Sequence, residues 1–233
     1  MTNILVTGSS RGIGAAILAT LSDAPDVTVA GHGTASGIAA DFADPGAVDQ
    51  LWQTALDRFD GRIDVLVNNA GIFEANPVDA ADAEWLAAWD RTIQVNLTAA
   101  AQLSRHAVRH WQADARGGRL VNVASRAAYR GDSPAHWHYA AAKAGMVAMT
   151  KTIARGYAAQ GILAFAICPG FTMTGMADDY LASRGGDKLL ADIPLGRVAE
   201  PPEVATVVRF LALEAPASMT GAVLDINGAS YVR

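Results

Sequence analysis

The stretch ILVTGSSRGIG, residues 4–14, places an aliphatic run directly before a glycine-rich turn, and the helix-forming stretch AAILATL follows it. In a strand–turn–helix unit, Gly8 permits a tight turn, Gly12 lets the backbone approach a pyrophosphate, and Gly14 lets the helix pack against the strand. A glycine repeat alone is a weak indication of function. With a strand before it and a helix after it, the repeat predicts a phosphate-binding turn.

Beyond this unit, short apolar runs alternate with helical patterns along the chain. Several of the runs are apolar almost throughout, which is typical of strands buried on both faces of a parallel sheet. The alternation predicts an α/β fold in which a doubly wound, mostly parallel sheet forms a single domain over residues 1–233. We expect further strands at residues 27–30, 38–40, 63–67, 119–124, 163–168 and 222–226, and helices at 44–59, 82–113, 139–159 and 203–213.

Two connections in this pattern are unusual. About seven residues separate the strands expected at 27–30 and 38–40, fewer than the dozen or more that a helical crossover needs. We therefore expect the second crossover helix to be missing, and the next helix to begin with Asp44 as its cap and Pro45 in its first turn. Periodicity is also lost over residues 171–197, which predicts a mobile flap over a pocket. The breaks in this segment are Gly175, Gly185, Gly186 and Pro194.

Composition narrows the class of protein. The chain has 233 residues, of which 51% are hydrophobic, and a net charge of −5. This balance favours a globular protein and gives no general attraction to nucleic acid or to an anionic membrane surface. The apolar runs are shorter than a membrane span, and the short N-terminal segment leaves no room for a signal peptide, so the cytoplasm is the expected location. The single cysteine, Cys168, is expected to be a small core residue.

A second informative stretch is HWHYAAAKAGMVAM, residues 136–149, which carries Tyr139 and Lys143. Residues four apart lie on one face of a helix, so the phenol and the ammonium can point into the same space. A nearby cation favours the phenolate, which would lower the pKa of Tyr139 toward the working range of a proton donor or acceptor. On this stretch alone, the alternative that both residues are simply helix surface stays open.

Polar or glycine-rich clusters follow five of the expected strands. In open α/β sheets ligands bind beyond the carboxyl ends of the strands, so these clusters fall on one rim. Turn formation alone would not require all five. They are the glycine turn itself, Asp41, residues 68–71 with the sequence NNAG, Ser125, and residues 169–174 with the sequence PGFTMT.

Together these motifs resemble the short-chain dehydrogenase/reductase family over essentially the whole chain. TGSSRGIG is similar to the family pattern TGxxxGIG, NNAG matches outright, and PGFTMTGM, residues 169–176, resembles the segment that holds the nicotinamide amide. The resemblance implies the Rossmann fold, a nicotinamide dinucleotide and hydride transfer. The positions of the family's catalytic tetrad are occupied by Asn96, Ser125, Tyr139 and Lys143.

The resemblance also assigns a role to each of the four. Tyr139 would protonate the carbonyl oxygen as hydride arrives, or act as the base in the reverse direction. Lys143 would hold the ribose hydroxyls and lower the pKa of the tyrosine, and Ser125 would hydrogen-bond the substrate oxygen. Asn96 would anchor a water that links Lys143 to solvent; from the residue alone, it could equally be a solvated helix position.

The same resemblance implies a set of cofactor contacts. Asp41 and Phe42 would meet the adenine, Asn69, Ala70 and Gly71 the adenosine ribose and nearby backbone, and Thr172 and Thr174 the carboxamide. Tyr139 and Lys143 contribute as well. The remaining expected cofactor-binding residues are Gly8, Ser9, Ser10, Arg11, Gly12, Ile13, Gly14, His32, Pro169 and Gly170.

Two departures bear on the choice of cofactor. Gly31 replaces the acid that NAD-preferring members carry after the second strand, and Arg11 stands where NADP-preferring members often have a base for the 2′-phosphate. His32, Thr34 and Ser36 could add donors. We therefore expect NADP(H), with NAD(H) as the alternative if Arg11 is only a solvated turn residue.

The histidines could suggest a metal, since His106 and His110 are spaced i, i+4 and His136 and His138 flank the tyrosine. No cysteine or glutamate stands nearby at a metal-ligand spacing, so we expect surface histidines and no metal site.

The function expected from the resemblance is NADPH-dependent reduction of a ketone to a secondary alcohol, as in 3-oxoacyl-acyl-carrier-protein reductases. Of the two arginines that dock the acidic carrier in those enzymes, Arg116 stands at one position, but Gln160 stands at the other. The alternatives are a dehydrogenase or reductase of a free small alcohol or ketone, with Trp137 and Tyr129 shaping the pocket, and a catalytically inactive nucleotide-binding scaffold. Trp85, Trp89 and Trp111 on one helical region predict subunit contacts and a homotetramer.

Overall fold

The computed structural model describes residues 1–33, 37–174 and 190–233. Six parallel strands form one sheet in the order β2-β1-β3-β4-β5-β6. The chain moves outward from β1 to β2 and then crosses to β3 on the other side of β1, which is the reversal of a doubly wound fold. The predicted fold class is therefore confirmed. The strands are β1 (Thr2–Val6), β2 (Val27–Gly31), β3 (Val65–Asn68), β4 (Gly118–Val123), β5 (Ile162–Pro169) and β6 (Val223–Ile226).

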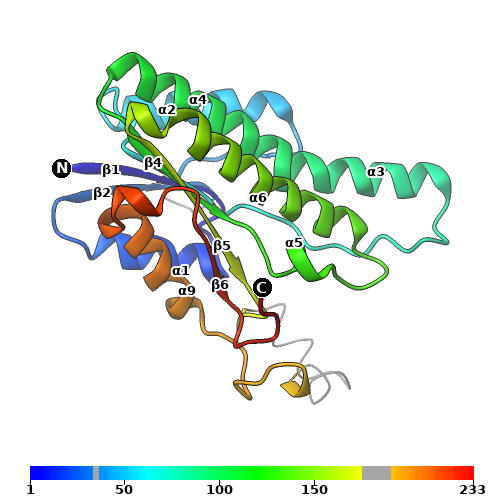
Figure 1. Cartoon of the computed structure of the whole chain (residues 1–233). Coiled ribbons are helices and arrows are strands. Elements are labelled where there is room, and N and C mark those ends of the chain that lie inside the picture. The colour runs from blue at the N-terminus through cyan, green and yellow to red at the C-terminus, as the bar shows by residue number, and fades with distance from the viewer. Residues whose placement is uncertain (34–36, 175–189) are drawn as a thin grey trace.

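Helices cover both faces of the sheet (Figure 1). One face packs against α1 (Gly12–Ser22) and α9 (Pro201–Arg209), the other against α2 (Pro45–Arg58), α4 (Ala99–Asp114) and α6 (Trp137–Tyr157). Alternate residues of each strand therefore enter different cores: on β1, Ile4 and Val6 pack toward α1 and α9, and Leu5 packs toward α2 and α4. This double burial explains the continuous apolar runs in the sequence.

The long helical stretch expected from residue 82 is interrupted. It consists of α3 (Asp82–Ile93), the π-helical turn η1 (Gln94–Thr98) and α4, and α3 projects beyond the sheet (Figure 1). Single π turns of this kind are frequent at functional sites. Shorter pieces complete the fold: α5 (Ala127–Arg130), η2 (Ala158–Gln160), η3 (Phe210–Glu214) and η4 (Ala217–Met219).

The connection between β2 and α2 is as short as expected, and its described residues, 32–33 and 37–44, contain no helix. The strand expected at 38–40 was wrong. Only a single bridge pairs His32 with Ile38, in which Ile38 N–H donates to Gly31 O at 2.8 Å and Gly33 N–H to Ile38 O at 3.0 Å. The chain then turns into α2, where Asp44 caps the helix by accepting from Gly46 N–H at 2.9 Å.

Some expectations lie outside the described residues. These are the donors Thr34 and Ser36 and most of the flap, residues 175–189 with Gly175, Gly185 and Gly186. Within the described part of the chain, no helix combines the length and the apolar character that a bilayer crossing requires.

Candidate active site

Because all six strands are parallel, their carboxyl ends meet at one edge of the sheet. The glycine turn follows β1, Asn69 and Gly71 follow β3, Ser125 follows β4, and Thr172 and Thr174 follow β5. The first turns of α6 bring Tyr139 and Lys143 to the same edge. The structure thus gathers the residues that the sequence predicted for one rim.

The turn after β1 is built for close approach of backbone. Gly8 has φ +66°, and a Cβ atom on it would lie 2.6 Å from the Cα of Ala70, so a side chain there would be strained by both conformation and space. The side-chain amide of Asn69 donates to Thr7 O at 3.0 Å and to Gly8 O at 2.9 Å. These bonds fasten the turn to the end of β3.

The N-terminus of α1 is open to a ligand. Arg11 occupies the N-cap position with no side-chain cap hydrogen bond, so the side chains leave the first N–H groups of this helix available to an anion. Arg11 is exposed, as is Ser10, whereas Ser9 is buried. This arrangement fits the pyrophosphate of a dinucleotide.

The catalytic candidates form one contiguous group. Ser125 is buried and hydrogen-bonds to the phenol of Tyr139, which is half-buried. The Nζ atom of Lys143 donates to Val123 O at 2.9 Å and lies 5.8 Å from the centre of the Tyr139 ring. The interpretation of these two residues as mere helix surface is therefore excluded by their burial and contacts.

Burial has a larger effect on the pKa values of Tyr139 and Lys143 than their charge interaction with each other. It raises the pKa of Tyr139 to about 12, and the hydrogen bond from Ser125 acts in the opposite direction. Burial also lowers the pKa of Lys143 to about 8. The expected lowering of the tyrosine pKa by Lys143 was wrong for this structure, because desolvation of the phenolate is the larger effect. Tyr139 therefore keeps its proton throughout the neutral range.

Asn96 sits in the π turn η1 and is completely buried. Its Oδ1 accepts from Ile72 N–H and its Nδ2 donates to Ile72 O, both at 2.8 Å. A Cβ atom on Gly71 would lie 3.3 Å from Asn96 Oδ1 and 3.6 Å from Lys143 Nζ. Asn96 is therefore not a solvated position: it fixes the chain that follows β3 beside Lys143.

The adenine side of the rim differs from expectation. The imidazole of His32 is buried and uses both nitrogens within the protein, so it is not a free donor for a phosphate. The ring of Phe42 is also buried and stacks on His32 with centroids 4.4 Å apart, rather than standing open on the rim. Asp41 is exposed, and its Oδ1 accepts from Ala43 N–H at 2.9 Å. Ile13 packs against the core on the α1 face.

The segment after β5 reaches back over the glycine turn. Thr174 lies close to Gly12: a Cβ atom added to Gly12 would be 3.0 Å from the Cγ2 atom of Thr174. Thr172 is buried and its Oγ1 donates to Gly170 O at 3.3 Å. Pro169 is the last residue of β5. Thr174 therefore lies beside the glycine turn, and the carboxamide contacts expected of the two threonines stay a prediction.

Sequence reasoning missed the aromatic surroundings of the catalytic tyrosine. Phe73 packs edge-on against Tyr139 at 4.8 Å and stacks on His136 at 3.9 Å between centroids. Trp137 is 54% exposed at the start of α6. His136 and His138 beside Tyr139 were the sequence feature that pointed to rings around the tyrosine. Nothing in the sequence indicated that Phe73, two residues beyond NNAG, would stack on His136.

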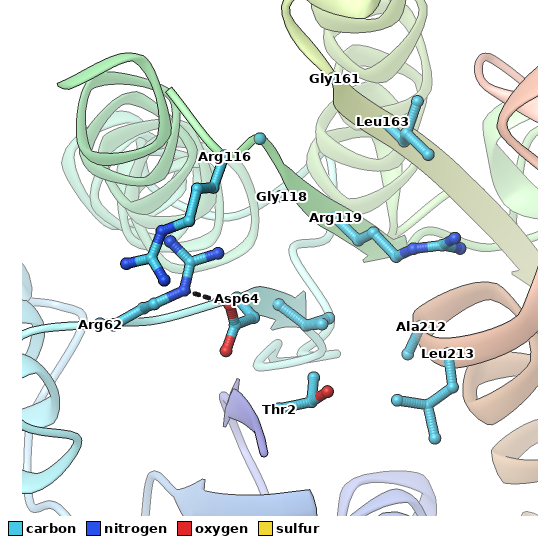
Figure 2. A pocket seen from close by; sticks show the side chains of 12 residues that line it. Thr2, Arg62, Asp64, Arg116, Gly118, Arg119, Gly161, Leu163, Ala212 and Leu213 are labelled. Carbon is cyan, nitrogen blue, oxygen red and sulfur yellow. Dashed lines mark ion pairs between the residues drawn. The ribbon is translucent and has the colours of Figure 1, made fainter. Parts of the chain in front are cut away.

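A hollow at the opposite edge of the sheet is a separate feature. Figure 2 shows it at the amino ends of the strands: a dashed line joins Arg62 to Asp64, and Arg119 points away from this pair, toward Ala212 and Leu213. Arg116 lies in the turn before β4. Arg116 pairs there with Asp114 at 2.8 Å, and Gln160 accepts from Gln112 at 2.9 Å. The two positions considered for carrier docking thus lie at the far ends of β4 and β5 from Ser125.

Comparisons with known proteins show what this chain is similar to over most of its length. Residues 10–229 match the family model described as enoyl-(acyl carrier protein) reductase. The 3-oxoacyl-acyl-carrier-protein reductase of Synechocystis sp. is 38% identical, with 96% of this chain and 94% of that protein covered. The cis-4-hydroxycyclohexanecarboxylate dehydrogenase of Sinomonas cyclohexanicum is 37% identical, with the same two coverages of 96% and 94%.

A solved structure shares the fold over the full length. It is a putative 2-deoxy-D-gluconate 3-dehydrogenase from Agrobacterium tumefaciens with bound NADP; the TM-score is 0.86 and the identity 31%, with 100% of this chain and 97% of that chain covered. The family model and these relatives cover nearly the whole chain, which therefore belongs to the short-chain dehydrogenase/reductase family and is an oxidoreductase.

Proposed function

We propose that this protein reduces a ketone to a secondary alcohol with NADPH, and that Tyr139 donates the proton to the carbonyl oxygen. The observation that carries this proposal is the grouping of Tyr139, Ser125 and Lys143 at the strand-end rim, where burial raises the pKa of the phenol to about 12. An acid that keeps its proton at neutral pH suits reduction, since the new hydroxyl group needs that proton. Oxidation of the alcohol would require the phenolate and would be favoured at high pH.

Each residue of the group has a part in this chemistry. When bound, the nicotinamide supplies the hydride. Ser125 holds the carbonyl oxygen beside the phenol and stabilises the negative charge that develops on it. Lys143, held by Val123 O, presents its ammonium to the ribose hydroxyls. Asn96 positions the chain around Gly71 and Ile72 next to Lys143, and a water held there would link the lysine to solvent.

The preference for NADPH rests on two residues. Arg11 is exposed at the N-terminus of α1, and the part of the chain that the structure describes offers it no ion pair. A guanidinium in this position can hold a 2′-phosphate. At Gly31, a Cβ atom would collide with Ser9 Oγ, so the site has no space for the acid that binds the ribose of NAD. The Agrobacterium structure that shares this fold contains NADP.

For the substrate, we propose a 3-oxoacyl group, because 3-oxoacyl-acyl-carrier-protein reductases recur among the similar proteins. The second candidate is a free small ketone or alcohol, with NAD(H) as the corresponding alternative cofactor. It is favoured by the aromatic ring of Phe73, which packs edge-on against Tyr139, and by the pairing of Arg116 with Asp114 on the edge away from Tyr139. An inactive nucleotide-binding scaffold is disfavoured because all four catalytic positions are kept and are grouped.

We also propose a cytoplasmic homotetramer. Leu86 on α3 and Trp137 on α6 are 56% and 54% exposed, which gives both helices apolar surface for subunit contacts. Trp111 cannot contribute, contrary to expectation, because it is fully buried and donates to Ile63 O at 2.7 Å.

The test of the function is a substrate panel with each cofactor. NADPH oxidation should be seen with a 3-oxoacyl thioester, and the carrier-linked and short synthetic thioesters should be compared at equal concentration. Better kcat/KM with free cyclic or aryl ketones than with either thioester would favour the second candidate. Cofactor binding without turnover of any ketone or alcohol would support the scaffold and overturn the proposal.

A further inference from the structure

His32 follows β2 directly and is 7% exposed. Both nitrogens of its imidazole lie within hydrogen-bond distance of backbone groups. Nδ1 is 3.1 Å from Gly8 N, and Nε2 is 2.9 Å from Ala40 O. The ring thus bridges the first glycine of the phosphate-binding turn and the segment that leads to α2.

These two partners determine the protonation state of the ring. A backbone N–H can only donate, so Nδ1 must offer a lone pair to Gly8. A carbonyl oxygen can only accept, so Nε2 must carry the hydrogen that it donates to Ala40. The bonding pattern therefore requires the neutral imidazole with its proton on Nε2. A protonated ring would direct a second N–H at Gly8 N–H, and that hydrogen bond would be lost.

The backbone of Gly8 is held by residues that follow both strands next to β1. Its N–H bonds to His32 after β2, and its carbonyl oxygen accepts from Asn69 Nδ2 after β3 at 2.9 Å. The backbone carbonyl of His32 also accepts from Ser9 N–H at 2.9 Å and from Ser9 Oγ at 3.0 Å. Gly8 and Ser9 begin the turn that leads to the open N-terminus of α1. Their position therefore depends on residue 32.

On its other side, His32 organises the shortened connection. Its ring stacks on Phe42 with an interplanar angle of 25°, and its bond to Ala40 O holds the chain between Ile38 and Phe42 against the sheet. In the described residues of this connection no helix provides a wall. The imidazole thus joins the remaining adenine-side segment to the phosphate turn.

We propose that neutral His32 is a positioning residue for dinucleotide binding, and that protonation of its imidazole releases Gly8 and weakens binding of the cofactor. The inference rests on the proposed use of a nicotinamide dinucleotide. It also explains how a chain without the second crossover helix keeps its phosphate turn in place.

The electrostatic surroundings favour the neutral form. Burial lowers the pKa of His32 from its ordinary value, and the bond to Ala40 O acts in the opposite direction. The segments that contact the ring carry the charged residues Arg11, Asp41 and Asp44, and among the described residues none of them forms an ion pair with it. The opposing helix α1 presents Leu18 toward Gly31. The positioning effect is therefore present at neutral pH and is lost as pH falls through the lowered pKa of His32.

Two substitutions separate the two hydrogen bonds. In His32→Asn, the Oδ1 atom takes the place of Nδ1 and can accept from Gly8 N–H at every pH. In His32→Gln, the terminal amide takes the place of Nε2 and can donate to Ala40 O, but the acceptor for Gly8 is removed. If the His32 ring served only for packing, both variants would lose cofactor affinity to the same extent.

Cofactor dissociation constants should be measured by fluorescence from pH 5 to 8 for the parent and for both variants, with NADPH and with NADH. We expect His32→Gln to bind about three- to tenfold more weakly than the parent at pH 7.5, and His32→Asn to bind within about threefold of it. Parent affinity should fall at low pH more than that of His32→Asn. The NADH arm is needed because the 2′-phosphate of NADPH itself titrates near pH ~6. His106→Gln on α4 is the control and should follow the parent.

Nitrogen chemical shifts of the imidazoles keep the inference testable if a variant does not fold. They should show His32 in the parent as the Nε2–H tautomer at neutral pH. An Nδ1–H tautomer, or equal pH profiles for the parent and His32→Asn, would overturn the inference. Failure of the parent to bind either dinucleotide would instead overturn the proposed function.

Discussion

The ammonium of Lys143 lies 2.9 Å from the carbonyl oxygen of Val123, at the end of β4 and two residues before Ser125. This bond ties α6 to the strand that carries the serine. It fixes the lysine beside Gly71 while leaving it 5.8 Å from the centre of the Tyr139 ring. Lys143 is therefore held at the rim, where we propose that it binds a ribose, and burial raises the pKa of Tyr139 to about 12.

The lysine gives the first prediction. Because burial lowers its pKa to about 8, the ammonium is present below that pH and is lost as pH rises through it. The affinity of the free enzyme for NADPH should therefore decline above pH ~8, by up to about tenfold at one unit higher. Lys143→Met should bind NADPH weakly at every pH, and its affinity should not decline further above pH ~8. A parent affinity that stays constant to pH 10 would contradict the role of Lys143.

The second prediction concerns the 2′-phosphate. Arg11→Ala should weaken NADPH binding and leave NADH binding nearly unchanged, since NADH has no phosphate for the guanidinium. A charge-assisted hydrogen bond contributes ~1.5–3 kcal/mol, and because Arg11 is exposed, screening favours the lower end, about tenfold. Arg105→Ala, on the exposed surface of α4, is the matched control. A parent that prefers NADH in steady-state kinetics would overturn the cofactor assignment.

The third prediction tests why residue 31 is glycine. Gly31→Asp should lower the melting temperature and weaken the binding of both NADPH and NADH, because its Cβ atom would collide with Ser9 Oγ. Overpacking of this kind lowers the free energy of unfolding by ~1–3 kcal/mol. Ser9→Ala removes that atom, so the double variant should recover stability and shift the preference toward NADH. Ser9→Ala alone is the control. A stable Gly31→Asp single variant would show that the space is not limiting.

The sheet and the rim could be predicted from the sequence because they follow from local patterns. Runs such as ILV and VLV indicate strands buried on both faces, and the strands in parallel order bring their polar ends together. The spacing of Tyr139 and Lys143 placed them on one helix face, but only their burial and contacts in the structure excluded the alternative of helix surface. These features depend on residues close in sequence, or on a rule of topology.

The predictions were wrong where residues far apart in the sequence determine the local structure or the pKa. The strand expected at 38–40 is replaced by one bridge because His32 draws Ala40 and Phe42 back toward Gly8. The pKa of Tyr139 is raised because the side chain is desolvated by burial, although the hydrogen bond with Ser125 acts in the opposite direction, and burial is not visible in a helical spacing. Trp111 was expected at a subunit contact, but its indole bonds to Ile63 across the core.

The fourth prediction concerns assembly. Light scattering at micromolar concentration should give the mass of a tetramer for the parent. Leu86→Glu should give a smaller species, because a charge would be placed on the exposed apolar face of α3. Gln53→Glu on the exposed side of α2 should leave the mass unchanged. A monomeric parent would contradict the proposal.

The central claim is that Tyr139 is the acid of a ketone reductase, and Tyr139→Phe tests it most directly. The substitution keeps the ring against Phe73 and removes only the hydroxyl that bonds to Ser125. We predict that kcat for NADPH-dependent reduction falls by about 10²–10⁴-fold, while the dissociation constant of NADPH changes by less than about twofold. Tyr157→Phe, which removes a hydroxyl at the opposite end of α6, should retain activity. Turnover of Tyr139→Phe within tenfold of the parent would show that the proton comes from another group.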